Sequence, residues 1–420
     1  MRLLPLSAAL VSCAAAIPTA SAQDLAAAIS DALAQTPEMA EANAGAAAAS
    51  ARLDRARAEG NPLLRVEGSY GAGRINNGGF FGLKADNVTP TALMATAEMP
   101  LYAGGRVSAA VAQAKGGVEM ARFGADQARL QTVVNAVSTY TEVLTARKLE
   151  ARFATLVSAL GESERQAGLR FKVGEIASSD VAQARARRAE AQAGFAQAQG
   201  RRIAAEAAYE RLTGKPAGEL APLPELPAVP PSLDEATDLA RNANPALRQA
   251  QSGVDVAKAG ARAARAEGLP TVGAFAEAAH VRDQFFPGYR ADSVSIGLRG
   301  RWTLFAGGRV SAQTRAADAD VDASEARLRQ ARLMLDGMVI EAWQGLVTAR
   351  QMLDASRLQS EAAAEALRGK RLEAKVGAMP TLAVLDAERE AIEAEAALLQ
   401  AEAMQTVAAW RLIALTGNID

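Results

Sequence analysis

A chain of 420 residues in which 22% are charged, with a net charge of -1 at pH 7, has no overall bias toward nucleic acid or anionic membrane surfaces. Hydrophobic residues make up 50% of the chain but aromatic residues only 4%, and this alanine-rich composition favours long, closely packed helices over a thick globular core. A single cysteine, Cys13, and a single histidine, His280, exclude an internal disulfide framework and a Cys/His metal site, and no cofactor is expected.

Residues 1–22 predict a secretory signal peptide. Arg2 precedes an apolar run, and Ala20-Ser21-Ala22 supplies the small residues of a cleavage site, so the mature chain is expected to begin at Gln23. A second interpretation is a lipoprotein cleavage box that ends at Cys13, whose thiol would then be acylated. A membrane-spanning helix needs about 18 apolar residues, and no apolar stretch beyond residue 22 approaches that length. Any membrane insertion must therefore use β-strands.

Next comes an alanine-rich stretch, followed by a stretch in which apolar residues alternate with polar or small ones. Leu25–Glu59 predicts a helix that breaks near Pro37. Within residues 62–102 the apolar period shortens to two, because side chains such as Leu64 and Val66 alternate with polar or small ones. This pattern predicts a β-hairpin with one apolar and one polar face.

Two helices joined by a tight turn complete this half of the chain. Val107 to about Phe171 predicts a helix of roughly 65 residues, on the order of 100 Å long, with the apolar spacing of a coiled coil. A tip near residues 173–180 reverses the chain, and the returning helix ends a first structural repeat of residues 23–214. Prolines crowd residues 215–231, which are therefore predicted to form an extended linker.

The second half, residues 232–420, is an internal repeat of the first. Leu101–Ala109 recurs as Leu304–Ala312, 203 positions later, whereas Arg57–Pro62 recurs as Arg265–Pro270, 208 positions later. The difference between the two offsets falls within the hairpin, where loops tolerate changes of length.

The repeat predicts the same elements again. We expect a helix that breaks near Pro245, a hairpin over residues 270–305, a long helix from Val310 to about Ala374, a tip near 376–383 and a returning helix. Aromatic residues are concentrated in both hairpins, a distribution typical of the aromatic girdles of membrane β-barrels. Among them are Phe80, Phe81, Phe285, Phe286, Tyr289 and Trp302.

The hairpins leave two interpretations open. Each hairpin can pack its apolar face on a helix of the same chain as a small sheet. Alternatively, the four strands join those of other subunits, because a closed membrane barrel needs at least about eight strands. Two copies would supply eight strands and three copies twelve.

These motifs resemble those of the TolC family of outer-membrane efflux proteins. The likeness covers essentially the whole mature chain and is most specific at Arg170–Val181 and at Lys375-Val376-Gly377 with Val384–Ala387. It implies a mainly α fold with four strands per protomer, shared in a trimeric 12-stranded barrel, plus a long periplasmic helical coiled-coil barrel. It also implies a homotrimer with two partners, a periplasmic adaptor and an inner-membrane transporter of the RND or ABC class.

The tips are the adaptor-contacting sites that the resemblance implies. Glycine can adopt the positive φ that reverses a helix, while serine, threonine and a first-turn proline suit the start of the returning helix. Ser178, Ser179 and Thr381 are therefore expected to cap the returning helices. The full set of tip residues is Val173, Gly174, Glu175, Ile176, Ser178, Ser179, Val376, Gly377, Ala378, Met379 and Thr381.

A periplasmic gate is also implied by the resemblance. Asp180 and Asp386 match acidic positions of relatives, but Ala383 replaces a second acidic ring residue and Met379 replaces an arginine. The gate is therefore expected to be less polar than in relatives. Asp386 can equally be a solvated helix carboxylate, and the alternating charges of Glu388-Arg389-Glu390 predict a water-facing surface.

Paired glycines stand where each hairpin meets its long helix, at Gly104, Gly105, Gly307 and Gly308. No Gly-Lys-Ser/Thr follows them, which excludes a phosphate loop, and they suit the change from strand to helix. No constellation of residues supports an enzyme. We predict a passive outer-membrane exit duct for drugs, small molecules or secreted proteins; the alternative is a periplasmic coiled-coil scaffold without transport activity.

Overall fold

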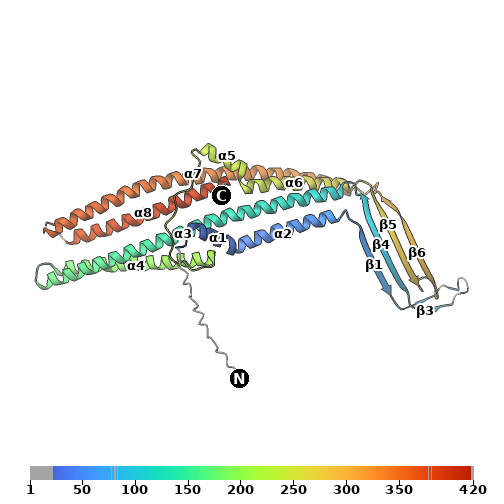
Figure 1. Cartoon of the computed structure of the whole chain (residues 1–420), viewed down its shortest axis with the longest axis horizontal. Coiled ribbons are helices and arrows are strands. Elements are labelled where there is room, and N and C mark those ends of the chain that lie inside the picture. The colour runs from blue at the N-terminus through green and yellow to red at the C-terminus, as the bar shows by residue number, and fades with distance from the viewer. Residues whose placement is uncertain are drawn as a thin grey trace, which may run out of the picture. The chain divides into compact units, whose positions relative to one another are not determined.

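The computed structural model describes residues 22–417, except 77, 80, 81, 83, 377 and 380 (Figure 1). Residues 1–21 of the predicted signal peptide, including Cys13, lie outside the described residues. So do Phe80 and Phe81 of the first hairpin and Gly377 and Pro380 of the second tip. What the sequence predicts for them stays a prediction.

Two compact units divide the chain, and each takes segments from both halves. The first unit lies within Met1–Gln35, Asn135–Leu226 and Gln351–Val407, and the second within Thr36–Val134, Pro227–Arg350 and Ala408–Asp420. The repeats along the sequence are therefore not compact units by themselves. A long helix of each repeat contributes to both units.

Prolines divide the first helical segment of each half. In the first half α1 spans Leu25–Gln35 and α2 spans Pro37–Ala58; in the second half α5 spans Leu233–Ala243 and α6 spans Pro245–Ala266. Each proline begins a helix, where its missing N–H removes no intrahelical hydrogen bond. Asn244 caps α6, because its Oδ1 accepts from Ala246 N–H at 3.0 Å.

The long helices are equal in length. α3 spans Arg106–Lys172 and α7 spans Arg309–Lys375, each with 67 residues, one longer at each end than the sequence pattern predicts. The returning helices α4, Ser178–Thr213, and α8, Thr381–Thr416, have 36 residues each. Residues 214–232, all of them described, contain no helix or strand, as their prolines require.

Within the second unit, four antiparallel strands form one sheet in the order β1-β4-β5-β6 (Figure 1). The strands are β1 Leu63–Tyr70, β4 Thr91–Tyr102, β5 Thr271–Arg282 and β6 Arg290–Arg301. The β4–β5 pair joins the two halves of the sequence, and β1 and β6 are the edges. A short hairpin, β2 Gly73–Ile75 with β3 Asp86–Val88, extends the first strand pair.

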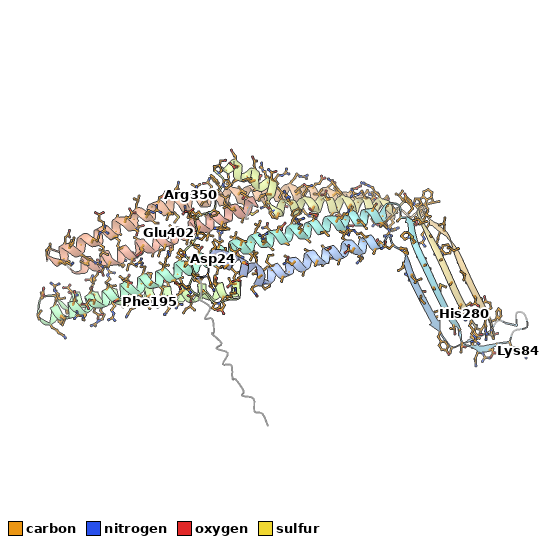
Figure 2. The ribbon with its side chains drawn as sticks, viewed as in Figure 1. Asp24, Lys84, Phe195, His280, Arg350 and Glu402 are labelled. Atoms are coloured by element: carbon orange, nitrogen blue, oxygen red, sulfur yellow. The ribbon has the colours of Figure 1, made fainter. Side chains whose placement is uncertain are left out.

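One face of this sheet leaves large apolar side chains exposed. Leu64 is 71% exposed, Val294 86% and Ile296 85%. Packing of this face on a helix of the same chain, one of the two interpretations above, is therefore wrong for the described residues. An aromatic cluster lies at the β5–β6 turn, where Tyr289 contacts Phe285 and Phe286 edge to face. His280 and Lys84 mark this end of the sheet (Figure 2).

Each unit has its own apolar core. In the first unit Leu156 and Leu160 of α3 pack with alanines of α4 and with Leu385 of α8. In the second unit Leu335 and Val339 of α7 pack with Leu412 of α8 and with small residues of α5. Alanine at the contacts lets these helices approach closely, as the composition predicts.

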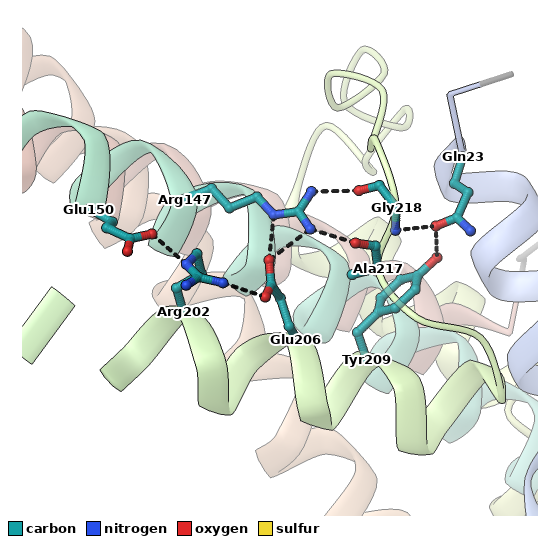
Figure 3. A network of polar contacts seen from close by, with 8 residues as sticks. All are labelled: Gln23, Arg147, Glu150, Arg202, Glu206, Tyr209, Ala217 and Gly218. Carbon is teal, nitrogen blue, oxygen red and sulfur yellow. Dashed lines mark hydrogen bonds and ion pairs between the residues drawn. The ribbon is translucent and has the colours of Figure 1, made fainter. Parts of the chain in front are cut away.

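A polar network fastens the start of the linker to the first unit (Figure 3). Arg147 donates through Nη1 to the Gly218 carbonyl and through Nη2 to the Ala217 carbonyl, each at 2.6 Å. Its Nε donates to Glu206 at 2.7 Å. Tyr209 lies beside them and donates to the Gln23 side chain at 3.3 Å.

Candidate functional site

The first tip is a tight helix-terminating turn. Gly174 has a φ of 78°, its N–H donates to the Phe171 carbonyl at 2.9 Å, and the Glu175 N–H donates to the Arg170 carbonyl at 2.9 Å. These two bonds form the Schellman arrangement that commonly ends helices at glycine. The predicted reversal at Gly174 is confirmed.

Side chains at this tip divide into exposed and packed ones. Val173 is 78% exposed, whereas Ile176 packs against the core of the first unit. Glu175 makes an ion pair with Arg170 at 2.5 Å, and this hydrogen bond lowers the pKa of Glu175. Val173 is thus the apolar side chain of this tip that is available to a partner.

The predicted capping of α4 by Ser178 and Ser179 is wrong. The helix begins at Ser178, so the capping position is Ala177, which has extended backbone angles and no side-chain cap. Instead the Asp180 carboxylate reaches back and accepts from the Ala177 N–H at 3.3 Å. An acidic residue at the third helical position suits this bond, so Asp180 has a local structural role.

The second tip repeats the main-chain geometry where it is described. The Ala378 N–H donates to the Glu373 carbonyl at 3.0 Å, the counterpart of the Glu175–Arg170 bond. Val376 is 79% exposed and Met379 is half-buried. α8 begins at Thr381, but its side chain is not described, so capping by Thr381 stays a prediction.

Asp386, the predicted gate residue, is paired. Its Oδ1 lies 3.0 Å from Nη2 of Arg187 on α4, and its side chain is 40% exposed. Arg187 also contacts Glu190 at 3.0 Å. The hydrogen bond with Glu190, followed by the charge of Asp386, raises the pKa of Arg187. The carboxylate at the predicted gate position is therefore neutralised within the chain by Arg187, a partner on another helix that the sequence pattern does not indicate.

A groove of about 430 Å³ lies in the first unit between α3, α7 and α8. Two ion pairs border it, Arg371 with Glu388 at 2.8 Å and Arg152 with Glu395 at 2.7 Å. The predicted water-facing position of Glu388 is wrong, because this residue is 9% exposed and its carboxylate turns toward Arg371.

The paired glycines at the strand-to-helix junctions all have positive φ. Gly104 and Gly105 have φ values of 60° and 85°, and Gly307 and Gly308 have 60° and 84°. An ion pair supports each junction at equivalent positions, Arg106 with Glu59 and Arg309 with Glu267, both at 2.9 Å.

The described residues include no group of three or more His, Cys, Asp or Glu side chains that could hold a metal ion. Among the described helices, none is both long and apolar enough to cross a membrane.

A family comparison decides the classification. The model of the family described as outer membrane efflux protein matches residues 28–215 and 236–418. The chain belongs to the outer membrane efflux protein family. This is the TolC family that the sequence motifs resemble, whose members are outer-membrane transport ducts and not enzymes.

Individual members of this family show how far the similarity extends. The chain is 28% identical over 226 residues to outer membrane efflux protein BepC of Brucella suis biovar 1, a match covering 53% of this chain and 48% of BepC. It is 29% identical over 342 residues to protein CyaE of Bordetella pertussis, covering 78% of this chain and 70% of CyaE. These matches thus span about half to two thirds of the curated relatives.

The solved outer membrane channel CmeC of Campylobacter jejuni has the same fold as this efflux protein family member. The TM-score is 0.81 over 94% of this chain and 85% of CmeC, at 16% identity. Identity this low supports the fold alone.

Proposed function

We propose that three copies of this chain form a passive exit duct through the outer membrane, as the last component of a tripartite export system. The observation that carries the proposal is the four-stranded sheet, which exposes large apolar side chains on one face. In water such a face is costly, whereas in lipid it is stabilised. Since a closed membrane sheet needs at least about eight strands, one copy is too few, and three copies supply twelve.

The tips are the proposed contacts for a periplasmic adaptor. Val173 and Val376 are exposed apolar side chains at equivalent places in the two repeats. An adaptor that buries both would be held mainly by apolar contact. The energy for export comes from the partner, an inner-membrane transporter of the RND or ABC class, because no constellation for ATP hydrolysis occurs in the sequence.

The proposed gate differs from a bare acidic ring. Asp386 is paired with Arg187, so the electrostatic potential around this carboxylate is that of an ion pair and not that of a free negative charge. Cargo would then be selected mainly by the transporter, and drugs, other small molecules or secreted proteins are the proposed classes.

The test is purification of the chain from outer membranes followed by two measurements. We expect a trimer that dissociates only on heating in SDS, and discrete conductance steps in planar lipid bilayers. Deletion of the gene should also abolish export by the partner transporter. A monomer in the soluble periplasmic fraction without conductance would support the scaffold alternative and overturn the duct.

A further inference from the structure

The two hairpins pair their own strands in an identical register. In the first hairpin Leu63 lies opposite Glu98, and in the second Thr271 lies opposite Arg301. These are equivalent residues, because the repeat offset is 208 positions before the hairpin loop and 203 after it. The sequence repeat is therefore a structural repeat at the level of single strand pairs.

The β4–β5 pair is the contact between the two repeats. Replacing each of its residues by the repeat counterpart gives the equivalent contact between β6 and β1, which we call the transposed contact. Glu98 of β4 lies opposite Phe275 of β5. Their repeat counterparts are Arg301, at the end of β6, and Glu67 in β1, the two edge strands. Within one chain these residues are at opposite edges of the sheet, so the transposed contact joins two chains.

In a barrel shared between protomers, β6 of one chain meets β1 of the next, and we propose that the two strands pair with Arg301 directly opposite Glu67. This inference rests on the trimeric channel proposed above, and it specifies the register and the chemistry of the seam between its subunits.

The polar face of the seam is complementary in charge. Arg301 and Glu67 point to the same side of the sheet as Glu98 and Phe275, because the side chains of residues paired across strands share a face. Within one chain Glu67 has only a long contact of 3.8 Å, to the neighbouring Arg65. A guanidinium placed opposite Glu67 gives its carboxylate a closer partner.

The apolar face of the seam explains which side chains are exposed at the edges. The transposed register places Leu298 opposite Tyr70 and Trp302 opposite Val66, and these four are 70%, 78%, 60% and 63% exposed in the single chain. At the corresponding positions of the β4–β5 pair Ala95 lies opposite Ala278 and Met99 lies opposite Ala274, so alanine takes three of the four places. Aromatic and aliphatic side chains paired across strands stabilise a sheet edge.

The strand-to-helix junction supports the same seam independently. A Cβ at Gly104 would lie 2.8 Å from the Leu269 Cβ, so the neighbouring repeat fills this space, whereas a Cβ at Gly307 would meet nothing within 4 Å. The counterpart of Leu269 is Asn61. Transposition places Asn61 of the next protomer in the open space beside Gly307, where the positive φ of 60° already favours glycine.

Disulfide crosslinking tests the register. Glu67→Cys and Arg301→Cys are combined in one chain, and outer membranes are oxidised and run on non-reducing SDS gels after boiling. We expect covalent dimers and trimers, at least about tenfold more abundant than with Arg301→Cys plus Ser69→Cys, because residues two positions off register lie beyond disulfide reach. Each single variant should give no crosslinked ladder.

The possible outcomes separate this inference from the proposed duct. If a heat-sensitive, conducting trimer forms but the Ser69 pair crosslinks better than the Glu67 pair, the register is wrong and the duct stands. If the parent protein forms no trimer at all, both fail.

As a second measurement, Glu67→Arg should lower the temperature at which the trimer dissociates in SDS, and adding Arg301→Glu should restore it. A further loss of stability in the double variant would overturn the ion pair.

Discussion

Arg187 pairs with Asp386, the acidic residue of the proposed gate. The two side chains lie 3.0 Å apart, and Arg187 is shared with Glu190. We predict that Arg187→Gln raises the preference for cations over anions by about twofold to tenfold, because it leaves the carboxylate unneutralised. Asp386→Asn should shift the preference the other way. Reversal potentials in planar bilayers with a salt gradient measure both.

Glu190→Gln is the matched control, since it removes the other partner of Arg187 but leaves the Arg187–Asp386 pair in place. It should change the reversal potential least. Identical reversal potentials for the parent, Arg187→Gln and Asp386→Asn would show that neither charge faces the ion path.

Tyr140 connects the segment at Gln23 with the linker through one hydroxyl group. Its Oη lies 2.8 Å from the carbonyl oxygen of Gln23 and 2.7 Å from that of Ala221, so the two carbonyls share its one O–H proton, and the residue is fully buried. We predict that Tyr140→Phe lowers the free energy of unfolding by about 1–2 kcal/mol, because the Ala221 carbonyl loses this donor, whereas the Gln23 carbonyl still accepts from the Ala221 N–H at 2.9 Å. Thermal unfolding followed by circular dichroism measures it. Tyr102→Phe, in an exposed residue, should be nearly neutral.

The same phenol predicts a response to alkaline pH. Burial, followed by the nearby Tyr209, raises the pKa of Tyr140 from 10.0 to about 12. The neutral form is favoured in the folded state, so this stabilisation is complete below pH 10 and is lost as the pH rises toward 12. In the Tyr140→Phe variant the loss of stability between these pH values should be smaller. An unchanged pH profile would contradict this role.

Among the elements, the strand-to-helix junctions combine two separate constraints. Gly104 and Gly105 both have positive φ, but a Cβ at Gly104 would clash with Leu269 at 2.8 Å, whereas one at Gly105 would only touch Ser108 at 3.9 Å. We predict that Gly105→Ala costs about 1–2 kcal/mol from backbone strain, and that Gly104→Ala costs clearly more. Trimer yield and heat resistance on SDS gels rank the two variants. Equal losses would mean that packing at Leu269 does not matter.

Elements that depend on local patterns were predictable from the sequence. The ends of α3 and α7 follow from the coiled-coil spacing and the flanking glycines, and the hairpins follow from the alternation of apolar residues. Features that depend on a partner from another helix were not. Glu388 belongs to an alternating run of charges, yet it is buried and forms an ion pair with the half-exposed Arg371 of α7. A local detail was missed as well: α4 begins at Ser178, one residue after its capping position, and Asp180 of the same helix accepts from the Ala177 N–H.

In the assembled molecule, the tips can be separated from the conducting path by experiment. Val173 and Val376 are 78% and 79% exposed, so their substitution disturbs little within the chain. We predict that Val173→Asp with Val376→Asp abolishes export through the partner transporter but leaves bilayer conductance unchanged, because a charge buried against the adaptor is unpaired. The control is Ile203→Asp, at another exposed apolar residue of the same unit but outside the tips. Normal export by the double variant would remove the tips from the adaptor contact.

The two faces of β6 allow a direct test of which side of the sheet meets lipid. Ile296 and Ser295 are adjacent and point to opposite faces, and Ile296 is 85% exposed. If the apolar face lies in the hydrocarbon layer, Ile296→Lys costs about 2–4 kcal/mol near the midplane, whereas Ser295→Lys on the polar face stays solvated. We therefore predict that Ile296→Lys strongly reduces the amount of trimer in outer membranes, while Ser295→Lys assembles normally and changes only conductance or ion selectivity. If instead Ser295→Lys fails to assemble and Ile296→Lys assembles normally, the lipid-facing side has been assigned to the wrong face of the sheet.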